Sequence, residues 1–310
     1  MSLIFNVNGP KKLRLLVILC SILLNGFHSF AQSHDADEGN VSADNVAKKL
    51  ADPNATIGFL SFPIDYITYR GSLPDANAQS AFKINFQPSL PYKLGDGMNL
   101  FFRPLIPIII KQPVSNGMGF DNAGVELGDI SFDIALGKTW SNKMVTILGM
   151  AGSIPTATDE ALGIKQWALG PELFVGKTTK WGFVGLLANH SWGLSDMHSQ
   201  EMAYVSSHDL FVSQANGGRL SITGGQYFYT VNLKKAWQIQ AQPTWSYNHN
   251  ASAGNRLTIP VGTGVAKTLV FGKLPIKFSV QYWYYAASPE QFGADHQVRF
   301  QIAPVIPLPW

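Results

Sequence analysis

The chain is poor in charge, nearly free of cysteine, and lacks long apolar runs. Asp, Glu, Lys and Arg make up 14% of its 310 residues, whereas a soluble domain usually carries about 25%. The one cysteine, Cys20, lies near the N-terminus, so the rest of the chain can form no disulfide, thiolate nucleophile or cysteine metal site. No segment reaches the roughly 20 apolar residues of a spanning helix. A chain of this composition exposes something other than a charged, solvated surface.

The first residues have the pattern of an export signal. Lys11, Lys12 and Arg14 precede a short apolar run, and small residues follow up to Ala31. This order is typical of a signal peptide. We therefore expect residues 1–31 to be removed by cleavage after Ala31.

Removal of this segment would change the charge of the chain. The full chain has 23 basic and 20 acidic residues. Residues 1–31 contain three basic and no acidic ones, which leaves 20 of each. The net charge of the exported part is then zero, so the basic balance is no argument for a nucleic-acid partner.

Residues 237–248 alternate between apolar and polar side chains at nearly every step. One face carries Trp237, Ile239 and Trp245, and the other carries a row of uncharged polar residues that begins with Gln238 and Gln240. Successive side chains of a strand point to opposite faces. Strands with one apolar and one polar face, repeated along a chain, are typical of a transmembrane β-barrel with a lipid-facing exterior and a polar lumen.

The sequence predicts an all-β fold, a transmembrane antiparallel up-and-down β-barrel of about 12 strands over residues 55–310. The expected strands are 55–69, 79–92, 98–111, 124–138, 143–154, 164–177, 181–193, 219–231, 236–249, 256–269, 274–286 and 296–308. Every second connection is short and carries lysine, and the others are mostly longer and carry acids. Bacterial barrels have short periplasmic turns and long outer loops, so we expect the short turns to face the periplasm.

Tryptophan positions give a second indication of the two membrane boundaries. Trp140, Trp181, Trp237 and Trp310 adjoin the short turns. Trp167, Trp192 and Trp283 lie near the long loops, and Trp245 lies somewhat deeper. Aromatic belts are expected at both interfaces. The alternative is a secreted β-sandwich with aromatic corners, which the low charge and the sorting of the loops argue against.

Two features lie outside the regular pattern. Proline removes a hydrogen-bond donor from a strand, and at five strand positions we predict bulges or broken pairings at one height of the barrel: Pro88, Pro104, Pro171, Pro243 and Pro304. Residues 32–54 form a polar periplasmic tail in which 43–50 are expected to be helical. This tail either plugs the inner mouth of the barrel or stays disordered.

The polar face supplies the candidate functional residues, and no catalytic, cofactor-binding or metal-binding residue is expected. The alternation predicts ten lumen-lining side chains: Lys83, Arg103, Asp133, Glu172, Gln238, Gln240, Gln242, Lys277, Gln281 and Arg299. One interpretation is that the charges pair across the lumen and hold its shape. The other is that some of them line a selective conduit. Twelve strands fall between filled 8-stranded barrels and the open channels of 16–18 strands, which favours a narrow passage.

Histidines and serines give little support to an enzyme. Five histidines lie in the expected outer half, and no pair has metal-ligand spacing on one face. His190 and Ser191 are adjacent, so they point to opposite faces of a strand and cannot form a nucleophile–base pair unaided. A lipid-modifying hydrolase is therefore the third interpretation, after a channel and a closed structural or binding barrel.

Several stretches resemble a family of bacterial outer-membrane proteins. They are 128–133 (GDISFD), 152–159 (GSIPTATD), 169–172 (LGPE), 225–229 (GQYFY), 281–285 (QYWYY) with 288–290 (SPE), and 304–310 (PVIPLPW). The family is the MetA-pathway-of-phenol-degradation group, often labelled "transporter" or "neuromedin U", and the resemblance extends from about residue 47 to the end. It implies an outer-membrane barrel that passes small, often aromatic or hydrophobic, compounds. It supplies no catalytic or binding residues.

We therefore expect a channel or transporter in the bacterial outer membrane that takes up small molecules passively. The expected partners are outer-membrane lipid and lipopolysaccharide, the barrel-assembly machinery and a small-molecule solute. No cofactor is expected.

Overall fold

The computed structural model describes residues 42–195, 202–205, 210–213 and 219–310. These residues belong to one compact unit, Val41–Trp310. The expected signal peptide, and the tail up to residue 41, lie outside the described residues.

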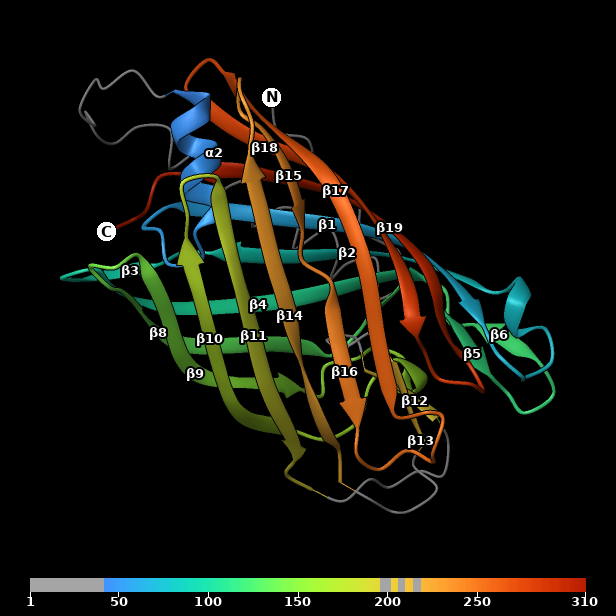
Figure 1. Ribbon diagram of the computed structural model, residues 1–310. Coiled ribbons are helices and arrows are strands. Elements are labelled where there is room, and N and C mark those ends of the chain that lie inside the picture. Colours follow the sequence, from blue (N-terminus) through green and yellow to red (C-terminus); the bar gives the residue numbers. More distant parts are fainter. Residues whose placement is uncertain (1–41, 196–201, 206–209, 214–218) are drawn as a thin grey trace, which may run out of the picture. The chain divides into compact units, whose positions relative to one another are not determined.

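Twelve antiparallel strands close into a barrel (Figure 1). Each strand pairs with the next along the chain, and the last pairs with the first, so that the sheet has no free edge. The strands of the wall are β1 (Gly58–Arg70), β2 (Ser80–Ser89), β4 (Met98–Lys111), β8 (Ile130–Thr139), β9 (Met144–Ile154), β10 (Ala168–Thr178), β11 (Gly182–Gly193), β14 (Ser221–Asn232), β15 (Trp237–Ala241) continued by β16 (Thr244–Asn248), β17 (Leu257–Phe271), β18 (Leu274–Ala287) and β19 (Gly293–Ile306). All twelve expected strands are thus confirmed.

Shorter elements lie at the two ends of the barrel. Helix α2 (Ala43–Ala51) and strand β3 (Tyr92–Gly95) lie at the end that carries the short turns, called here the turn end. The opposite, loop end carries β5 (Pro113–Ser115), β6 (Phe120–Asn122), β7 (Glu126–Leu127), β12 (Met202–Val205), β13 (Leu210–Ser213) and the 3₁₀ turns η1 (Ala76–Ala78) and η2 (Glu160–Leu162). Among the described residues, no helix has both the length and the apolar character that crossing a membrane requires.

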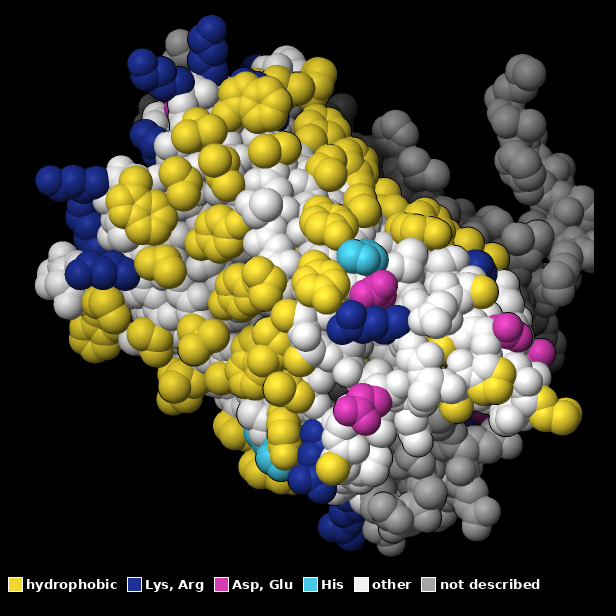
Figure 2. Space-filling model, turned by 45° about the vertical axis from the view of Figure 1, so that its right-hand side comes forward, with side chains coloured by type: hydrophobic (Ala, Val, Ile, Leu, Met, Phe, Trp, Pro, Cys, Tyr) yellow, Lys and Arg dark blue, Asp and Glu magenta, His cyan; other side chains and the backbone are white. Residues whose placement is uncertain are grey.

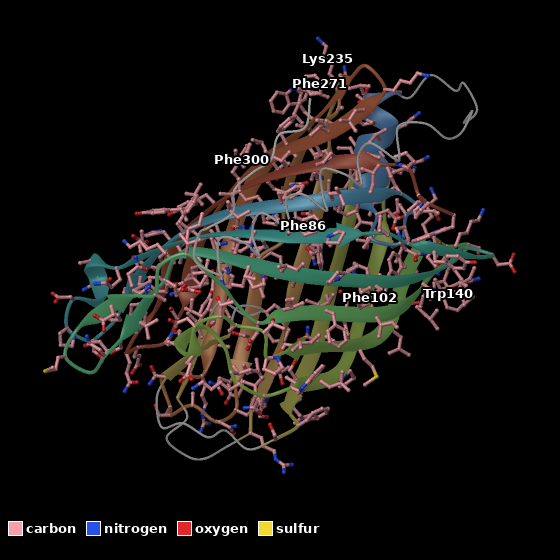
Figure 3. The ribbon with its side chains drawn as sticks, turned by 180° about the vertical axis from the view of Figure 1, so that it is seen from behind. Phe86, Phe102, Trp140, Lys235, Phe271 and Phe300 are labelled. Carbon is pink, nitrogen blue, oxygen red and sulfur yellow. The ribbon has the colours of Figure 1, made fainter. Side chains whose placement is uncertain are left out.

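The two faces of the wall follow the predicted alternation. Along β18, Val280, Tyr282 and Tyr284 are exposed, while Gln281 and Trp283 between them are buried. Apolar side chains cover the outside of the wall, with Lys and Arg gathered toward one edge of this band (Figure 2). Phe102, Trp140, Phe271 and Phe300 project outward from the barrel (Figure 3). An apolar exterior of this kind suits contact with lipid.

Seven of the eight tryptophans lie at least partly exposed, and one does not. Six of them are 45–55% exposed, namely Trp140, Trp167, Trp181, Trp192, Trp237 and Trp310. Trp283 was expected near the outer boundary, but it is 0% exposed and its indole lies 4.5 Å from the guanidinium carbon of Arg299. The prediction is wrong for Trp283 because it occupies an inward position of β18. Gly262 on β17 leaves it room, since a Cβ there would lie 2.3 Å from the indole ring.

Helix α2 confirms the predicted helix and docks onto the turn end of the barrel. The backbone N–H of Ala236 donates to Asp44 Oδ1 (2.7 Å), and Gln238 Nε2 donates to the carbonyl oxygen of Ala47 (2.9 Å). Ala51 packs against a buried cluster of wall residues that includes Phe174 and Phe183. The helix therefore lies against the inner face of the strands, which favours the plug over the disordered tail.

The five strand prolines interrupt pairing without shifting the register. Pro88 and Pro104 would face each other between β2 and β4, but the ladder stops before them. Pro171 has no partner on β11, and Pro304 has none on β1. Pro243 separates β15 from β16. The predicted broken pairings are present: four of the prolines lose one side of the ladder and Pro243 loses both, while the flanking residues keep their register.

The interruption at Pro243 opens the backbone ladder between two wall strands. Residues 237–239 pair with β17, and so do 246 and 247, but residues 240–245 do not. Two tyrosines of β14 bridge this gap. Tyr227 Oη donates to the carbonyl oxygen of Pro260, and Tyr229 Oη donates to that of Gly262, each at 3.1 Å. Hydrogen bonds from side chains thus replace part of the missing backbone pairing.

At the loop end, a buried carboxylate connects two of the sequence stretches described above, 128–133 and 152–159. Asp129, just before β8, accepts backbone N–H groups from Thr156 and Ala157 (3.0 Å each) and from Ile164 (2.8 Å). Burial raises the pKa of Asp129, and the three hydrogen bonds act in the opposite direction. These hydrogen bonds thus hold the two stretches against each other in the loops.

We predict that the double variant Tyr227→Phe/Tyr229→Phe is less stable than the native barrel. Each lost hydroxyl leaves a β17 carbonyl without its donor next to the apolar exterior, at a cost of about 1–3 kcal/mol per group. The measurement is thermal unfolding in detergent micelles, followed by β-sheet circular dichroism. Tyr66→Phe, an exposed outward tyrosine of β1, is the control. Equal melting temperatures for the double variant and the control would contradict the bridging role.

Candidate lumen site

The barrel encloses a cavity of about 310 Å³. Eight of the ten predicted lumen residues line it, namely Lys83, Arg103, Asp133, Glu172, Gln240, Gln242, Lys277 and Arg299. Gln238 and Gln281 also lie on the inner face, where both are buried and make other contacts. The wall further includes apolar side chains, among them Leu50, Phe59, Leu105, Ile147, Phe174, Phe183, Leu187 and Phe228.

One group of charges crosses three strands. Arg103 on β4 lies opposite Asp133 on β8, and its Nε donates to both carboxylate oxygens (2.9 and 3.1 Å). One of its terminal nitrogens lies 3.6 Å from Glu172 Oε1 on β10. One guanidinium therefore holds two carboxylates that would otherwise repel each other.

A second group is centred on Asp65, a residue that the sequence reasoning missed. Asp65 is fully buried and accepts Arg299 Nε (2.6 Å) and Arg299 Nη2 (2.8 Å). Gln297 and Asn85 also donate to it, at 2.9 and 3.2 Å. Lys83 lies directly opposite Asp65 in the β1–β2 register. The alternation of β1 gives only a weak signal for Asp65, because the inward face that carries Ser61 and Asp65 also carries the apolar Ile67 and Tyr69.

The β12–β13 hairpin, which lies in a stretch predicted from the sequence to be a connection, reaches the lumen. Tyr204 on β12 is fully buried beside Ile109 and Leu162. Lys83 Nζ donates to its hydroxyl (3.2 Å), and the ammonium lies 5.8 Å from the ring centre. Tyr204 therefore brings β12 to the loop end of the cavity, where it contacts Lys83.

The glutamines form links between strands. The backbone N–H of Gln242 donates to Gln281 Oε1 (3.2 Å), and Gln242 Nε2 lies 3.5 Å from Gln301 Oε1. Gln281 also accepts the indole N–H of Trp283 (3.2 Å). The first of these contacts satisfies a backbone donor beside Pro243, where the wall ladder is missing.

At the turn end, the segment after α2 lines the cavity and is hydrogen-bonded to the barrel wall. Asn54 Nδ2 donates to the carbonyl oxygen of Gly97 (3.0 Å) and to Thr139 Oγ1 (2.7 Å). Asn99 Nδ2 donates to the backbone carbonyl oxygen of Asn54 (2.7 Å). Burial raises the pKa of Asp52, and its hydrogen bond from the Asn54 N–H acts in the opposite direction. The segment is thus fixed to β4 and β8 by buried polar contacts.

Two histidines meet near the loop end, although the sequence showed no such pair. His190 Nδ1 and His249 Nε2 each lie 2.8 Å from Thr223 Oγ1, and the ring centres are 5.3 Å apart. Ser191 is buried on the opposite face of β11, so the expected separation of His190 from Ser191 is confirmed. Among the described residues, no group of three or more His, Cys, Asp or Glu side chains is placed to hold a metal ion.

Comparison with known proteins identifies the fold. No protein-family model matches the chain, and no curated protein does. The COG4313 outer membrane channel from Pseudomonas putida F1 is similar in structure, with a TM-score of 0.59 and 14% identity, over 88% of this chain and 100% of that one. The NanC porin has a TM-score of 0.47 and 10% identity, over 80% and 100%. Outer membrane phospholipase A from Escherichia coli has a TM-score of 0.38 and 11% identity, over 86% and 98%. At these identities the first likeness establishes the fold of an outer-membrane barrel, and the other two carry no argument.

We predict that Arg299→Met destabilises the barrel by about 3–5 kcal/mol, because it leaves the Asp65 carboxylate buried without its main counter-ion. The double variant Asp65→Asn/Arg299→Met removes both charges and should recover much of this loss. The measurement is again thermal unfolding in micelles. A single variant as stable as the native protein would show that the pair lies in a more solvated lumen than its burial indicates.

Proposed function

We propose that this protein is a passive channel for small molecules in a bacterial outer membrane. The main observation in support of this proposal is the cavity of about 310 Å³ inside a closed twelve-stranded barrel with an apolar exterior. A closed barrel satisfies every strand edge, as a lipid environment requires. The channel named for the similar structure from Pseudomonas putida supports this reading. Residues 1–31 would serve as the export signal, and the turn end would face the periplasm.

The wall of the cavity supports a small solute with an aromatic or hydrophobic part. Phe59, Phe174 and Phe228 contribute apolar surface, and the paired charges and glutamines contribute polar surface. Ligand pockets typically begin at about 300 Å³, and an apolar cavity of about 150 Å³ already binds benzene. A single-ring compound therefore fits. The resemblance to the MetA-pathway family points in the same direction.

Two inward elements define the ends of the passage. Helix α2 docks at the turn end through Asp44 and Gln238. Tyr204 on the β12–β13 hairpin contacts Lys83 at the other end. In this proposal they are constrictions that limit the size and rate of passage. A closed structural or binding barrel is the alternative if neither constriction yields. His190 contacts Thr223 and His249 rather than Ser191, which gives little support to a lipid hydrolase.

We predict that undocking α2 increases conductance. In Asp44→Ala/Gln238→Ala, the helix loses both hydrogen bonds to the turn end, so single-channel conductance in planar bilayers should rise at least about twofold over the native channel. Swelling of liposomes in a small neutral sugar should accelerate as well.

Lys48→Ala is the matched control. Lys48 is an exposed residue of the helix, so its substitution removes no docking contact. Cell fractionation should place the native protein with the outer membrane. If neither the native protein nor the undocked variant conducts, the barrel is closed and the channel proposal is wrong.

A further inference from the structure

Most cations of the cavity wall are neutralised by carboxylates or occupied by other partners. Arg103 is shared by Asp133 and Glu172, and Arg299 is held by Asp65. Lys83 donates to Tyr204 and lies opposite Asp65. These cations hold the barrel together, as the first interpretation of the sequence supposed. They have little remaining charge to offer a solute.

Lys277 differs from these cations. It lies on β18 with its side chain in the cavity wall, and within the described residues it makes no hydrogen bond or ion pair. Its neighbours across the two ladders are Thr268 on β17 and Ala303 on β19, and neither carries charge. Asp52, a carboxylate of the same wall, accepts the Asn54 N–H at the end of α2. Among the residues that the structure describes, Lys277 is thus the lumen ammonium group without a counter-ion.

An uncompensated ammonium in such a wall is costly, because the interior solvates charge less well than water does. An anion that enters the cavity removes part of this cost and forms a charge-assisted hydrogen bond. Apolar surface lies in the same wall, since Phe59 lines the cavity from β1, the strand next to β19, and Leu50 and Ala51 line it from α2. The wall therefore combines a cation with surface for an apolar group.

We infer that Lys277 forms a binding subsite for the carboxylate of a small aromatic acid, whose ring lies against the apolar part of the cavity wall. This inference rests on the proposed passage of small molecules and adds the charge of the solute. It places anion selectivity at Lys277, and not at Arg103 or Arg299, whose charges are paired with carboxylates.

The test compares benzoate with benzamide, a neutral molecule of nearly the same shape. Binding to the full exported protein in detergent is measured by titration calorimetry. The native protein should bind benzoate more tightly than benzamide by about tenfold, the scale of one charge-assisted hydrogen bond. Lys277→Met should lose this preference while it still binds benzamide, and Lys277→Arg should retain it. Lys273→Met, in the exposed β17–β18 turn, should behave like the native protein.

Three further readouts keep the outcomes separate. Heat-modifiable migration in gels shows that each variant still forms a barrel. Swelling of liposomes in a small neutral sugar reports on the channel itself, because such a solute crosses a bare bilayer slowly and carries no charge for Lys277 to bind. Equal benzoate affinity in Lys277→Met and the native protein would overturn the subsite, whatever the swelling rate. Absence of swelling with the native protein would instead overturn the channel, and charge-dependent benzoate binding would then identify a binding barrel.

Discussion

Closure of the backbone hydrogen-bond ladder is the constraint on which the rest of this structure depends. Strands that face lipid find no water to satisfy their N–H and C=O groups, so each must pair on both sides. Pairing of β1 with β19 removes the last free edge. Once the ladder is closed, the strand period of two assigns every side chain to the outside or the lumen. The apolar exterior, the polar interior and the cavity are consequences of this closure.

The few places where the ladder is incomplete show how side chains compensate. Pro243 interrupts the wall between β14 and β17, and Tyr227 and Tyr229 donate to the carbonyl groups left open there. Gln281 accepts the neighbouring backbone N–H of Gln242 from the lumen side. The wall thus contains a segment held by side chains from both faces, in place of six residues of regular pairing.

Charge inside the barrel has two separate roles. The Asp65–Arg299 pair joins the neighbouring strands β1 and β19, the Arg103–Asp133 pair joins β4 and β8, and Arg103 also reaches Glu172 on β10. Their mutual neutralisation makes a buried polar interior tolerable, because each charge finds an opposite one within hydrogen-bonding distance or close to it. Lys277 stands apart from this network. The paired charges hold the shape of the lumen, and of the cations in the described part of the chain Lys277 is the one left to act on a solute.

Sequence alone determined the architecture, because alternation and turn composition are local properties. The twelve strands, the helix over 43–50 and the inward positions of the ten candidate residues all follow from period, spacing and residue type. The pattern could also show where prolines would disturb pairing. It could not show that the disturbance takes the form of ladder gaps, because this depends on what the neighbouring strands do.

The tertiary structure decided which inward residues meet. Asp65 and Arg299 are more than two hundred positions apart and become partners only because the barrel closes between β1 and β19. Tyr204 reaches Lys83 through a long connection whose sequence carries no strand signal of comparable strength. Trp283 appeared to mark the membrane boundary, yet its place on the inner face and the room left by Gly262 bury it beside Arg299. The register of the strands and the closure of the barrel decide which charges are neutralised. They also decide that Lys277 is not. These are properties of the whole sheet, and no single segment contains them.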